Sequence, residues 1–210
     1  MAAKIIAIEG SDGVGKATQA EMLVRHLKEE GFKIASMSFP RYDTELGKEI
    51  KKHLMNKTEL SKDPLQMSKL YHEDRKSALP LIKRMIQEND FIIFDRYKYS
   101  SMAHQASKAD PDKREEIIKQ IAEMEKDIPE ADIVIVLMIP SEMSQKMLEK
   151  EKIKDMYESS IEYQNNTNQI YKELSSQNNW IEIECVENRN LLSIDEIHNK
   201  IYLAVKEFLK

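Results

Sequence analysis

The chain has 210 residues, of which 33% are charged and 41% hydrophobic, a composition typical of one globular domain. Its single cysteine, Cys185, excludes an internal disulfide. Asp and Glu outnumber Lys and Arg by 37 to 32, so the net charge of -5 provides no overall basic field for nucleic acid. No apolar stretch approaches the roughly 20 residues that a membrane span needs. We therefore expect one cytoplasmic domain over residues 1–210 that binds neither membranes nor nucleic acid.

Five short apolar runs rich in β-branched residues predict strands. They cover residues 5–8, 34–39, 91–94, 133–139 and 180–184. Helices are predicted at residues 16–30, 45–55, 64–88, 100–126, 141–150, 154–176 and 194–209. Asp63 before Pro64, and Ser193 with Glu196, are typical of helix starts. Almost continuously apolar strands that alternate with helices predict an α/β fold, with three layers (α/β/α) around a five-stranded parallel sheet.

A glycine-rich turn follows the first predicted strand and precedes a predicted helix, which is the context of a phosphate-binding loop. In such a loop, glycines let successive backbone N–H groups point at one anion, and the helix N-terminus adds partial positive charge. Lys16, after the last glycine, supplies a mobile cation for the β- and γ-phosphates of ATP. We predict ATP binding by Gly10, Ser11, Asp12, Gly13, Val14, Gly15, Lys16, Ala17 and Thr18.

One position departs from the usual phosphate-loop pattern. The residue after the lysine is usually Ser or Thr, whose hydroxyl reaches Mg²⁺, whereas this chain has Ala17. Thr18 lies about 100° further round the helix, so it does not replace that hydroxyl by the same geometry. Either Mg²⁺ is held through water and phosphate oxygens, or the handling of ATP is weakened. Asp12 and Asp95 are the carboxylates available to the metal.

Four further clusters predict a second site, for a phosphorylated acceptor. Residues 39–42, Phe-Pro-Arg-Tyr, end the second predicted strand at the edge where open α/β sheets bind ligands. Tyr71 and Arg75 are four residues apart and share a helix face, where the ring could stack on a base and the guanidinium grip a phosphate. Residues 95–97, Asp-Arg-Tyr, directly follow the third strand. Residues 155–158, Asp-Met-Tyr-Glu, open a helix after a lysine-rich segment, which is either a mobile basic flap or a plain helical connection.

Together these motifs resemble the thymidylate kinase family, whose members transfer the γ-phosphoryl group of ATP to dTMP. The match comprises Ile-Glu-Gly-x-Asp-Gly-x-Gly-Lys-x-Thr at residues 8–18, Phe-Pro-Arg-Tyr at 39–42, Asp-Arg at 74–75, Asp-Arg-Tyr at 95–97 and Tyr-Glu at 157–158. The resemblance implies a nucleoside monophosphate kinase fold of the P-loop type, a homodimer packed through long helices, and a short lid at about residues 142–156.

The resemblance also implies roles for individual residues, carried over by position. Lys16, Asp12, Arg96 and Asp95 are expected to be catalytic, with Asp12 and Asp95 near Mg²⁺. The dTMP site is expected to include Phe39, Pro40, Arg41, Tyr42, Tyr71, Arg75, Arg96, Ser100, Ser101, His104, Asp155, Tyr157 and Glu158. Phosphoryl transfer needs charge stabilisation, which we assign to Lys16, Arg96 and one lid lysine. Arg41 and Arg75 are assigned to the acceptor phosphate.

Some positions depart from the family pattern. Ser101 stands where many members have Asn or Gln, and His104 replaces an aromatic residue. The lid has no arginine, because none occurs between Arg114 and Arg189. These departures leave three alternatives open: a kinase for dUMP or a purine monophosphate, a deoxynucleoside kinase, and a nucleotide-binding protein without catalysis. The isolated histidines His26, His53 and His198 show no metal-ligand spacing, and we expect no metal role for them.

Overall fold

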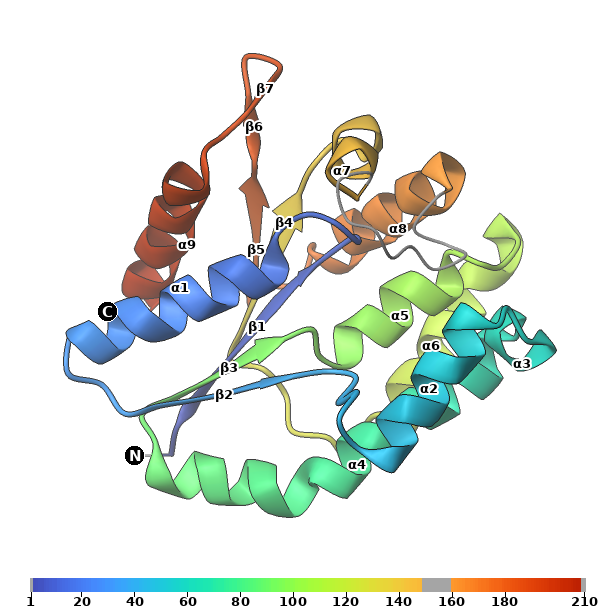
Figure 1. Ribbon diagram of the computed structural model, residues 1–210, viewed down its shortest axis with the longest axis horizontal. Helices are drawn as coiled ribbons and strands as arrows, with labels where there is room; N and C mark the ends of the chain where they lie inside the picture. The colour runs from blue at the N-terminus through green and yellow to red at the C-terminus, as the bar shows by residue number, and fades with distance from the viewer. Residues whose placement is uncertain (1, 149–159, 209–210) are drawn as a thin grey trace.

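The computed structural model describes residues 2–148 and 160–208 of the chain. Five parallel strands form one sheet in the order β2-β3-β1-β4-β5 (Figure 1). The strands are β1 (Lys4–Gly10), β2 (Ile34–Ser38), β3 (Phe91–Asp95), β4 (Ile133–Met138) and β5 (Trp180–Glu184). All five predicted strands are confirmed, and so is the parallel sheet.

Helices cover both faces of this sheet (Figure 1). They are α1 (Lys16–Glu29), α2 (Glu45–Met55), α3 (Glu59–Lys62), α4 (Pro64–Glu88), α5 (Lys98–Ala106), α6 (Arg114–Met124), α7 (Ser141–Leu148), α8 (Ile161–Leu174) and α9 (Ile194–Phe208). Helices α1 and α9 pack together on one face, while α4, α5, α6 and α8 form the layer on the other. The predicted three-layer arrangement is therefore confirmed. Within the described ranges, no helix combines the length and the apolar content needed to cross a membrane.

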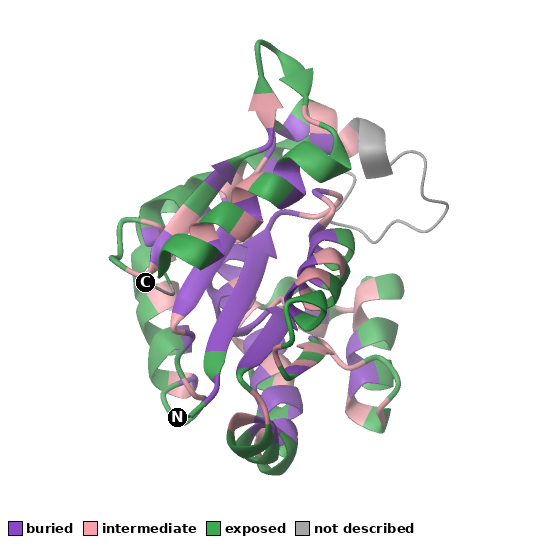
Figure 2. Ribbon diagram, turned by 90° about the vertical axis from the view of Figure 1, so that its left-hand side faces the viewer, coloured by how far each residue is buried: buried purple, intermediate pink, exposed green. Residues whose placement is uncertain are grey.

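The core lies on both sides of the central strands, which explains why they are apolar throughout. In β1, Ile5 and Ala7 pack into the core beneath α4, α5 and α6, while Ile6 and Ile8 pack into the core beneath α1 and α9. Successive side chains of a strand point to opposite faces, so a strand covered on both faces needs apolar residues at every position. Figure 2 shows the buried strands at the centre of the molecule.

The prediction of one helix over residues 100–126 is wrong. The structure has α5, a loop, a short 3-10 helix at Pro111–Lys113 and then α6. Pro111 has no N–H to donate and disfavours helical geometry at Asp110, whose φ and ψ are -55° and 143°. The helix predicted over residues 154–176 has its described part in α8, which begins at Ile161, where Ser160 is extended and accepts a hydrogen bond from Tyr163 N. Residues 154–159 of that prediction lie outside the described residues. Helix α3 and the hairpin of β6 (Val186–Glu187) and β7 (Asn190–Leu191) were not predicted from the sequence.

Both predicted helix caps are confirmed. The Asp63 carboxylate accepts hydrogen bonds from Leu65 N at 3.0 Å and Gln66 N at 3.1 Å at the start of α4. At the start of α9, Ser193 N donates to the Glu196 carboxylate at 2.8 Å, and Glu196 N donates to Ser193 Oγ at 3.2 Å. This reciprocal pair satisfies two backbone donors that the helix itself leaves free.

Candidate active site

A cavity of about 490 Å³ lies beside the carboxyl ends of β1 and β3, a volume within the range of small-molecule sites. The predicted site residues that line it are Asp12, Gly13, Gly15, Lys16, Ala17, Thr18, Phe39, Pro40, Tyr42, Tyr71, Arg75, Asp95, Arg96, Ser100, Ser101 and His104. Gly10, Ser11, Val14 and Arg41 are not among the lining residues. Asp155, Tyr157, Glu158 and the end of the predicted lid lie outside the described residues. The structure thus brings the ATP loop and most of the predicted acceptor site into one cavity.

The phosphate loop takes a backbone path that favours glycine. Gly10, Gly13 and Gly15 have φ values of 141°, 74° and 85°, which L side chains rarely adopt. A Cβ added at Gly10 would also lie 2.7 Å from Leu137 O, so the loop requires glycine there. Lys16 begins α1 and donates from Nζ to Ser11 O at 2.6 Å. Burial and the nearby charge of Arg96 lower the pKa of Lys16 to about 8.

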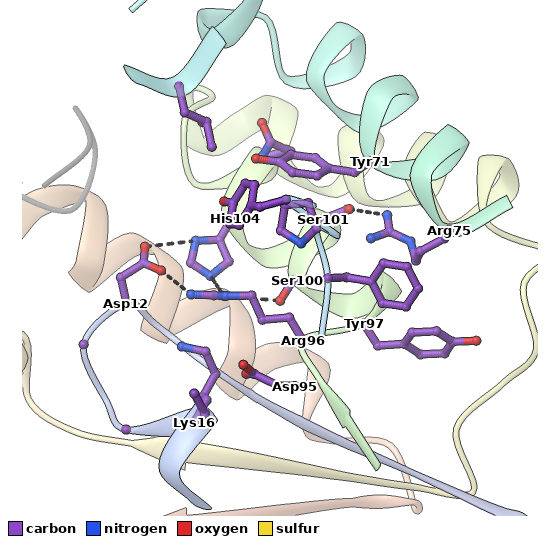
Figure 3. A pocket seen from close by; sticks show the side chains of 18 of the residues that line it. Asp12, Lys16, Tyr71, Arg75, Asp95, Arg96, Tyr97, Ser100, Ser101 and His104 are labelled. Carbon is purple, nitrogen blue, oxygen red and sulfur yellow. Dashed lines mark hydrogen bonds and ion pairs between the residues drawn. The ribbon is translucent and has the colours of Figure 1, made fainter. Parts of the chain in front are cut away.

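Arg96 forms the centre of the charged end of the cavity (Figure 3). It directly follows β3 and has a φ of 62°, which is uncommon for a residue other than glycine. Its Nη2 forms an ion pair with Asp12, while Nη1 donates to His104 Nε2 at 2.9 Å and to Ser100 Oγ at 3.4 Å. Burial raises the pKa of Asp12, but the charges of Arg96 and Lys16 outweigh it and lower that pKa to about 2. Asp12 is therefore a carboxylate that holds Arg96 in place.

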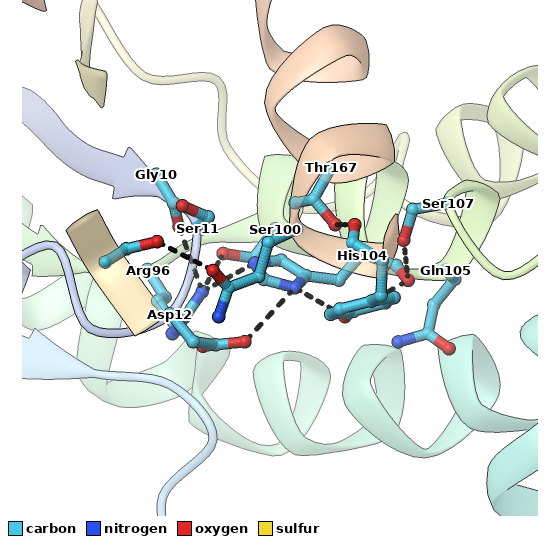
Figure 4. A network of polar contacts seen from close by, with 12 residues as sticks. Gly10, Ser11, Asp12, Arg96, Ser100, His104, Gln105, Ser107 and Thr167 are labelled. Atoms are coloured by element: carbon cyan, nitrogen blue, oxygen red, sulfur yellow. Dashed lines mark hydrogen bonds and ion pairs between the residues drawn. The ribbon is translucent and has the colours of Figure 1, made fainter. Parts of the chain in front are cut away.

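His104 is a neutral partner of Arg96. Burial lowers the pKa of His104 to about 3. A guanidinium only donates, so His104 Nε2 accepts from Arg96 and the ring proton lies on Nδ1. That Nδ1 donates to Tyr163 Oη at 2.7 Å. Figure 4 shows His104 within the polar network that includes Asp12, Arg96 and Ser100. The imidazole thus links Arg96 to α8 without adding charge.

Glu9 stabilises the charged end of the cavity through a set of buried hydrogen bonds. It is fully buried at the end of β1 and accepts from Tyr97 N at 2.8 Å, from Ser100 N at 3.2 Å and from Tyr171 Oη at 2.8 Å. Its carboxylate also accepts from Ser100 Oγ at 2.5 Å. Burial raises the pKa of Glu9. These bonds tie the turn that carries Arg96 to the sheet and to α8.

Both arginines that were assigned to the acceptor phosphate already hold carboxylates. Arg41 donates from Nε to Asp74 Oδ1 at 3.0 Å and does not line the cavity, so this geometry does not support its assignment. Arg75 lines the inner end of the cavity, where Nε donates to Glu125 Oε2 at 3.1 Å and Nη2 donates to Ser101 Oγ at 2.6 Å. Its charge is offset by Glu125, which suits it to an uncharged part of a ligand better than to a phosphate.

Two carboxylates at the charged end differ in their availability to a cation. Asp95 Oδ1 is buried, and no described residue donates a hydrogen bond to it. Asp12, in contrast, is bound to Arg96. No three metal-ligating side chains come together in the part of the chain that the structure describes. This donor set fits Mg²⁺, which is commonly held by one or two carboxylates together with substrate phosphates and water.

Comparison with known proteins identifies the family. The family model described as thymidylate kinase matches residues 8–201. The chain belongs to the thymidylate kinase family. It is 32% identical to a thymidylate kinase from Dictyostelium discoideum, over 93% of this chain and 82% of that protein. A probable thymidylate kinase from Methanocaldococcus jannaschii is also 32% identical, over 93% and 92% of the two chains. The solved structure of the Candida albicans thymidylate kinase has a similar fold, with a TM-score of 0.77 at 22% identity, covering 98% and 92% of the two chains.

Several residues of the thymidylate kinase site were not predicted from the sequence. Leu54, Gln105, Lys108 and Tyr163 line the cavity, and Glu9 and Glu125 lie behind it. Of these residues, only Glu9 could have been recognised from the sequence, because its carboxylate interrupts an otherwise apolar strand. Glu125 stands in a charged segment that has the pattern of an exposed helix, and only its pairing with a residue 50 positions away shows its role.

Proposed function

We propose that this chain transfers the γ-phosphoryl group of ATP to dTMP in the described cavity, giving dTDP and ADP for dTTP biosynthesis. The observation that carries the proposal is the juxtaposition in one cavity of the phosphate loop with an inner end lined by Phe39, Tyr71 and Arg75. A protein that only binds ATP has no use for that second end. Membership in the thymidylate kinase family supports both the reaction and ATP as co-substrate.

The charged end performs the transfer. In-line phosphoryl transfer requires alignment of two nucleotides and neutralisation of the charge that spreads over the moving group. Lys16 and Arg96 provide two cations there, and Asp12 and His104 fix the orientation of Arg96. The acceptor needs no general base, because a monophosphate already presents an anionic oxygen.

The inner end binds the base of the acceptor. The Arg75 guanidinium lies 6.0 Å from the centroid of the Phe39 ring, and Ser101 accepts from Arg75 at the same place. Because Ser101 Oγ accepts this bond, its own hydrogen is available to a ligand acceptor such as a base carbonyl. We therefore assign Arg75 to the base of dTMP and not to its phosphate.

Mg²⁺ is the metal we propose for the charged end, where Asp95 would hold it together with ATP phosphates and water. When bound, the ion neutralises phosphate charge. The family resemblance supports Mg²⁺ and a homodimer, and a cytoplasmic location stays a prediction. Asp155, Tyr157 and Glu158 remain predicted dTMP contacts on the same basis.

An acceptor panel tests the proposed function. Release of ADP is measured by a coupled assay with ATP and Mg²⁺ against dTMP, dUMP, dGMP, AMP, CMP, UMP and thymidine. The proposal predicts the highest kcat/KM for dTMP. A different best acceptor would overturn the substrate, and the absence of turnover with every acceptor, in protein that binds ATP, would overturn the reaction.

A further inference from the structure

A buried carboxylate lies directly behind the inner end of the cavity. Glu125 is the residue that follows α6, its exposed fraction is 0%, and it is not among the residues that line the cavity. A carboxylate without a partner in such a place would strongly destabilise the fold. Its ion-pair partner is Arg75. His72 Nδ1 lies 3.5 Å from Glu125 Oε2 but forms no hydrogen bond with a described residue. Glu125 therefore depends on Arg75, and Arg75 is a residue of the cavity.

The contact between the two side chains is bidentate. Arg75 Nε donates to Glu125 Oε2 at 3.1 Å, and Arg75 Nη2 forms an ion pair with Glu125 Oε1. Two parallel bonds between a planar guanidinium and a planar carboxylate fix the plane of the guanidinium as well as its place. The third bond, from Nη2 to Ser101 Oγ at 2.6 Å, fixes the edge of the guanidinium that faces α5 (Figure 3).

This arrangement leaves one nitrogen of the guanidinium for a ligand. The hydrogen bonds between Arg75 and the described residues use Nε and Nη2, so Nη1 keeps its two donors. Arg75 has an exposed fraction of only 2% but still lines the cavity. A long side chain that was held by Ser101 alone could turn about its own bonds, and ordering it on binding would lower affinity.

We propose that Glu125 is a positioning residue for the acceptor: it holds Arg75 in the one orientation that presents Nη1 to the bound nucleoside monophosphate. The inference rests on the proposed function, because it takes dTMP as the ligand of the inner end. It assigns control of acceptor affinity to a residue that touches neither nucleotide. ATP binds at the other end, so its affinity does not depend on Glu125.

Binding measurements on three variants test this role. Calorimetric titration with dTMP alone and with ATP alone is carried out on the unaltered chain, Glu125→Gln, Glu125→Asp and Glu123→Gln. Glu125→Gln keeps the size of the side chain and removes its charge, whereas Glu125→Asp keeps the charge and shortens the reach by one methylene. Glu123→Gln is the matched control, because Glu123 lies two residues away and is exposed.

We expect both Glu125 variants to raise the Kd for dTMP by about 10- to 100-fold, the usual effect of losing a hydrogen bond to a charged group. The Kd for ATP should change by less than about twofold, and Glu123→Gln should leave both constants unchanged. In turnover, KM for dTMP should rise by a larger factor than kcat falls. Thermal unfolding of each variant verifies that it is folded, and if Glu125→Gln does not fold, Glu125→Asp decides by the same criteria.

Three results would overturn the proposal. A folded Glu125 variant with unchanged affinity for dTMP would show that Arg75 needs no support. A parallel loss of affinity for ATP and dTMP, or failure of both variants to fold, would assign Glu125 to the fold alone. If the unaltered chain binds ATP but not dTMP, the proposed function fails first and the inference fails with it.

Discussion

Arg96 is the residue around which the charges of the site are organised. Asp12, His104 and Ser100 all bind its guanidinium, and they come from the phosphate loop and from α5. A fixed guanidinium stabilises the charge of a transferred phosphoryl group without the reorganisation that a mobile one would need. Lys16 supplies the second cation from the first turn of α1. The two cations thus reach the cavity from two different elements.

Replacement of Lys16 should lower the activity of the enzyme without lowering its stability. We expect Lys16→Ala to lower kcat by roughly 10²- to 10³-fold, because one preorganised charge at the transferred group is lost. The free energy of unfolding should not fall, because burial disfavours the ammonium in the folded chain. Steady-state kinetics and urea unfolding measure the two quantities. A variant with unaltered kcat would exclude Lys16 from the transfer.

The pKa of Lys16 predicts an alkaline limb in the pH profile. Its pKa of about 8 means that the free enzyme loses this cation as the pH rises above that value. We therefore expect kcat/KM for ATP to decline above about pH 8, since this parameter reports on the free enzyme. Lys16→Arg keeps its charge at such pH values, so its residual activity should lack the limb. An identical limb in both proteins would assign the titration to another group.

Single residues show what sequence could and could not predict. The phosphate loop was predictable because consecutive residues build it, and the structure places Asp12, Lys16 and Arg96 together. The partners of Arg41 and Arg75 were not predictable, because Asp74 and Glu125 lie 33 and 50 residues away from them. A guanidinium binds carboxylates as readily as phosphates, so its residue type alone does not distinguish these roles.

At the scale of elements, the wall of the cavity depends on the contact between α2 and the segment that follows β2. Gly47 in α2 is buried against Arg41, and a Cβ built on it would lie 1.9 Å from Arg41 O. The same segment carries Pro40 and Tyr42, which line the cavity. The absence of a side chain at Gly47 is thus what allows α2 to approach the acceptor site.

A methyl group at Gly47 should push these two elements apart. We expect Gly47→Ala to lower the free energy of unfolding by about 1–3 kcal/mol, as overpacking usually does, and to raise KM for dTMP more than KM for ATP. Lys48→Ala, at the exposed neighbouring position, should change neither quantity. Urea unfolding and steady-state kinetics provide the comparison. Equal stability of the two variants would show that α2 is free to shift.

Element boundaries were predictable where local chemistry decides them. Asp63 and Ser193 were predicted as caps and both accept the expected backbone bonds. The break between α5 and α6 was missed, although Pro111 signals it, because apolar residues continue the helical pattern on both sides. The hairpin of β6 and β7 was missed because its two-residue strands are too short for a periodic pattern.

In the molecule as a whole, the central sheet forms the centre of the buried core and also positions the residues of the site. The central strands β1, β3 and β4 are almost wholly buried, and the Lys16 and Arg96 segments follow β1 and β3 at the same edge. The fold was largely predictable, because only a sheet covered on both faces accounts for runs such as Ile133–Met138. The arrangement of the cavity could not be predicted from the sequence, because it depends on long-range contacts that only the structure shows.

Stability should depend on the centre of this sheet far more than on its surface. Ile135 in β4 is fully buried, and we expect Ile135→Ala to lower the free energy of unfolding by about 2–5 kcal/mol. Leu203 on α9 is 65% exposed, and Leu203→Ala should cost less than about 0.5 kcal/mol. The single tryptophan, Trp180, reports unfolding by fluorescence. Similar costs for both substitutions would contradict the assignment of the core.

Transfer of the γ-phosphoryl group from ATP to dTMP is the reaction on which the roles of all these residues depend. Its most direct test is to incubate the chain with dTMP, Mg²⁺ and ATP labelled at the γ-phosphate, and to separate the products by chromatography. We expect the label to appear in dTDP, and Lys16→Ala to slow its appearance by at least about a hundredfold. Label that is released only as inorganic phosphate, or that stays in ATP while dTMP remains unchanged, would contradict it.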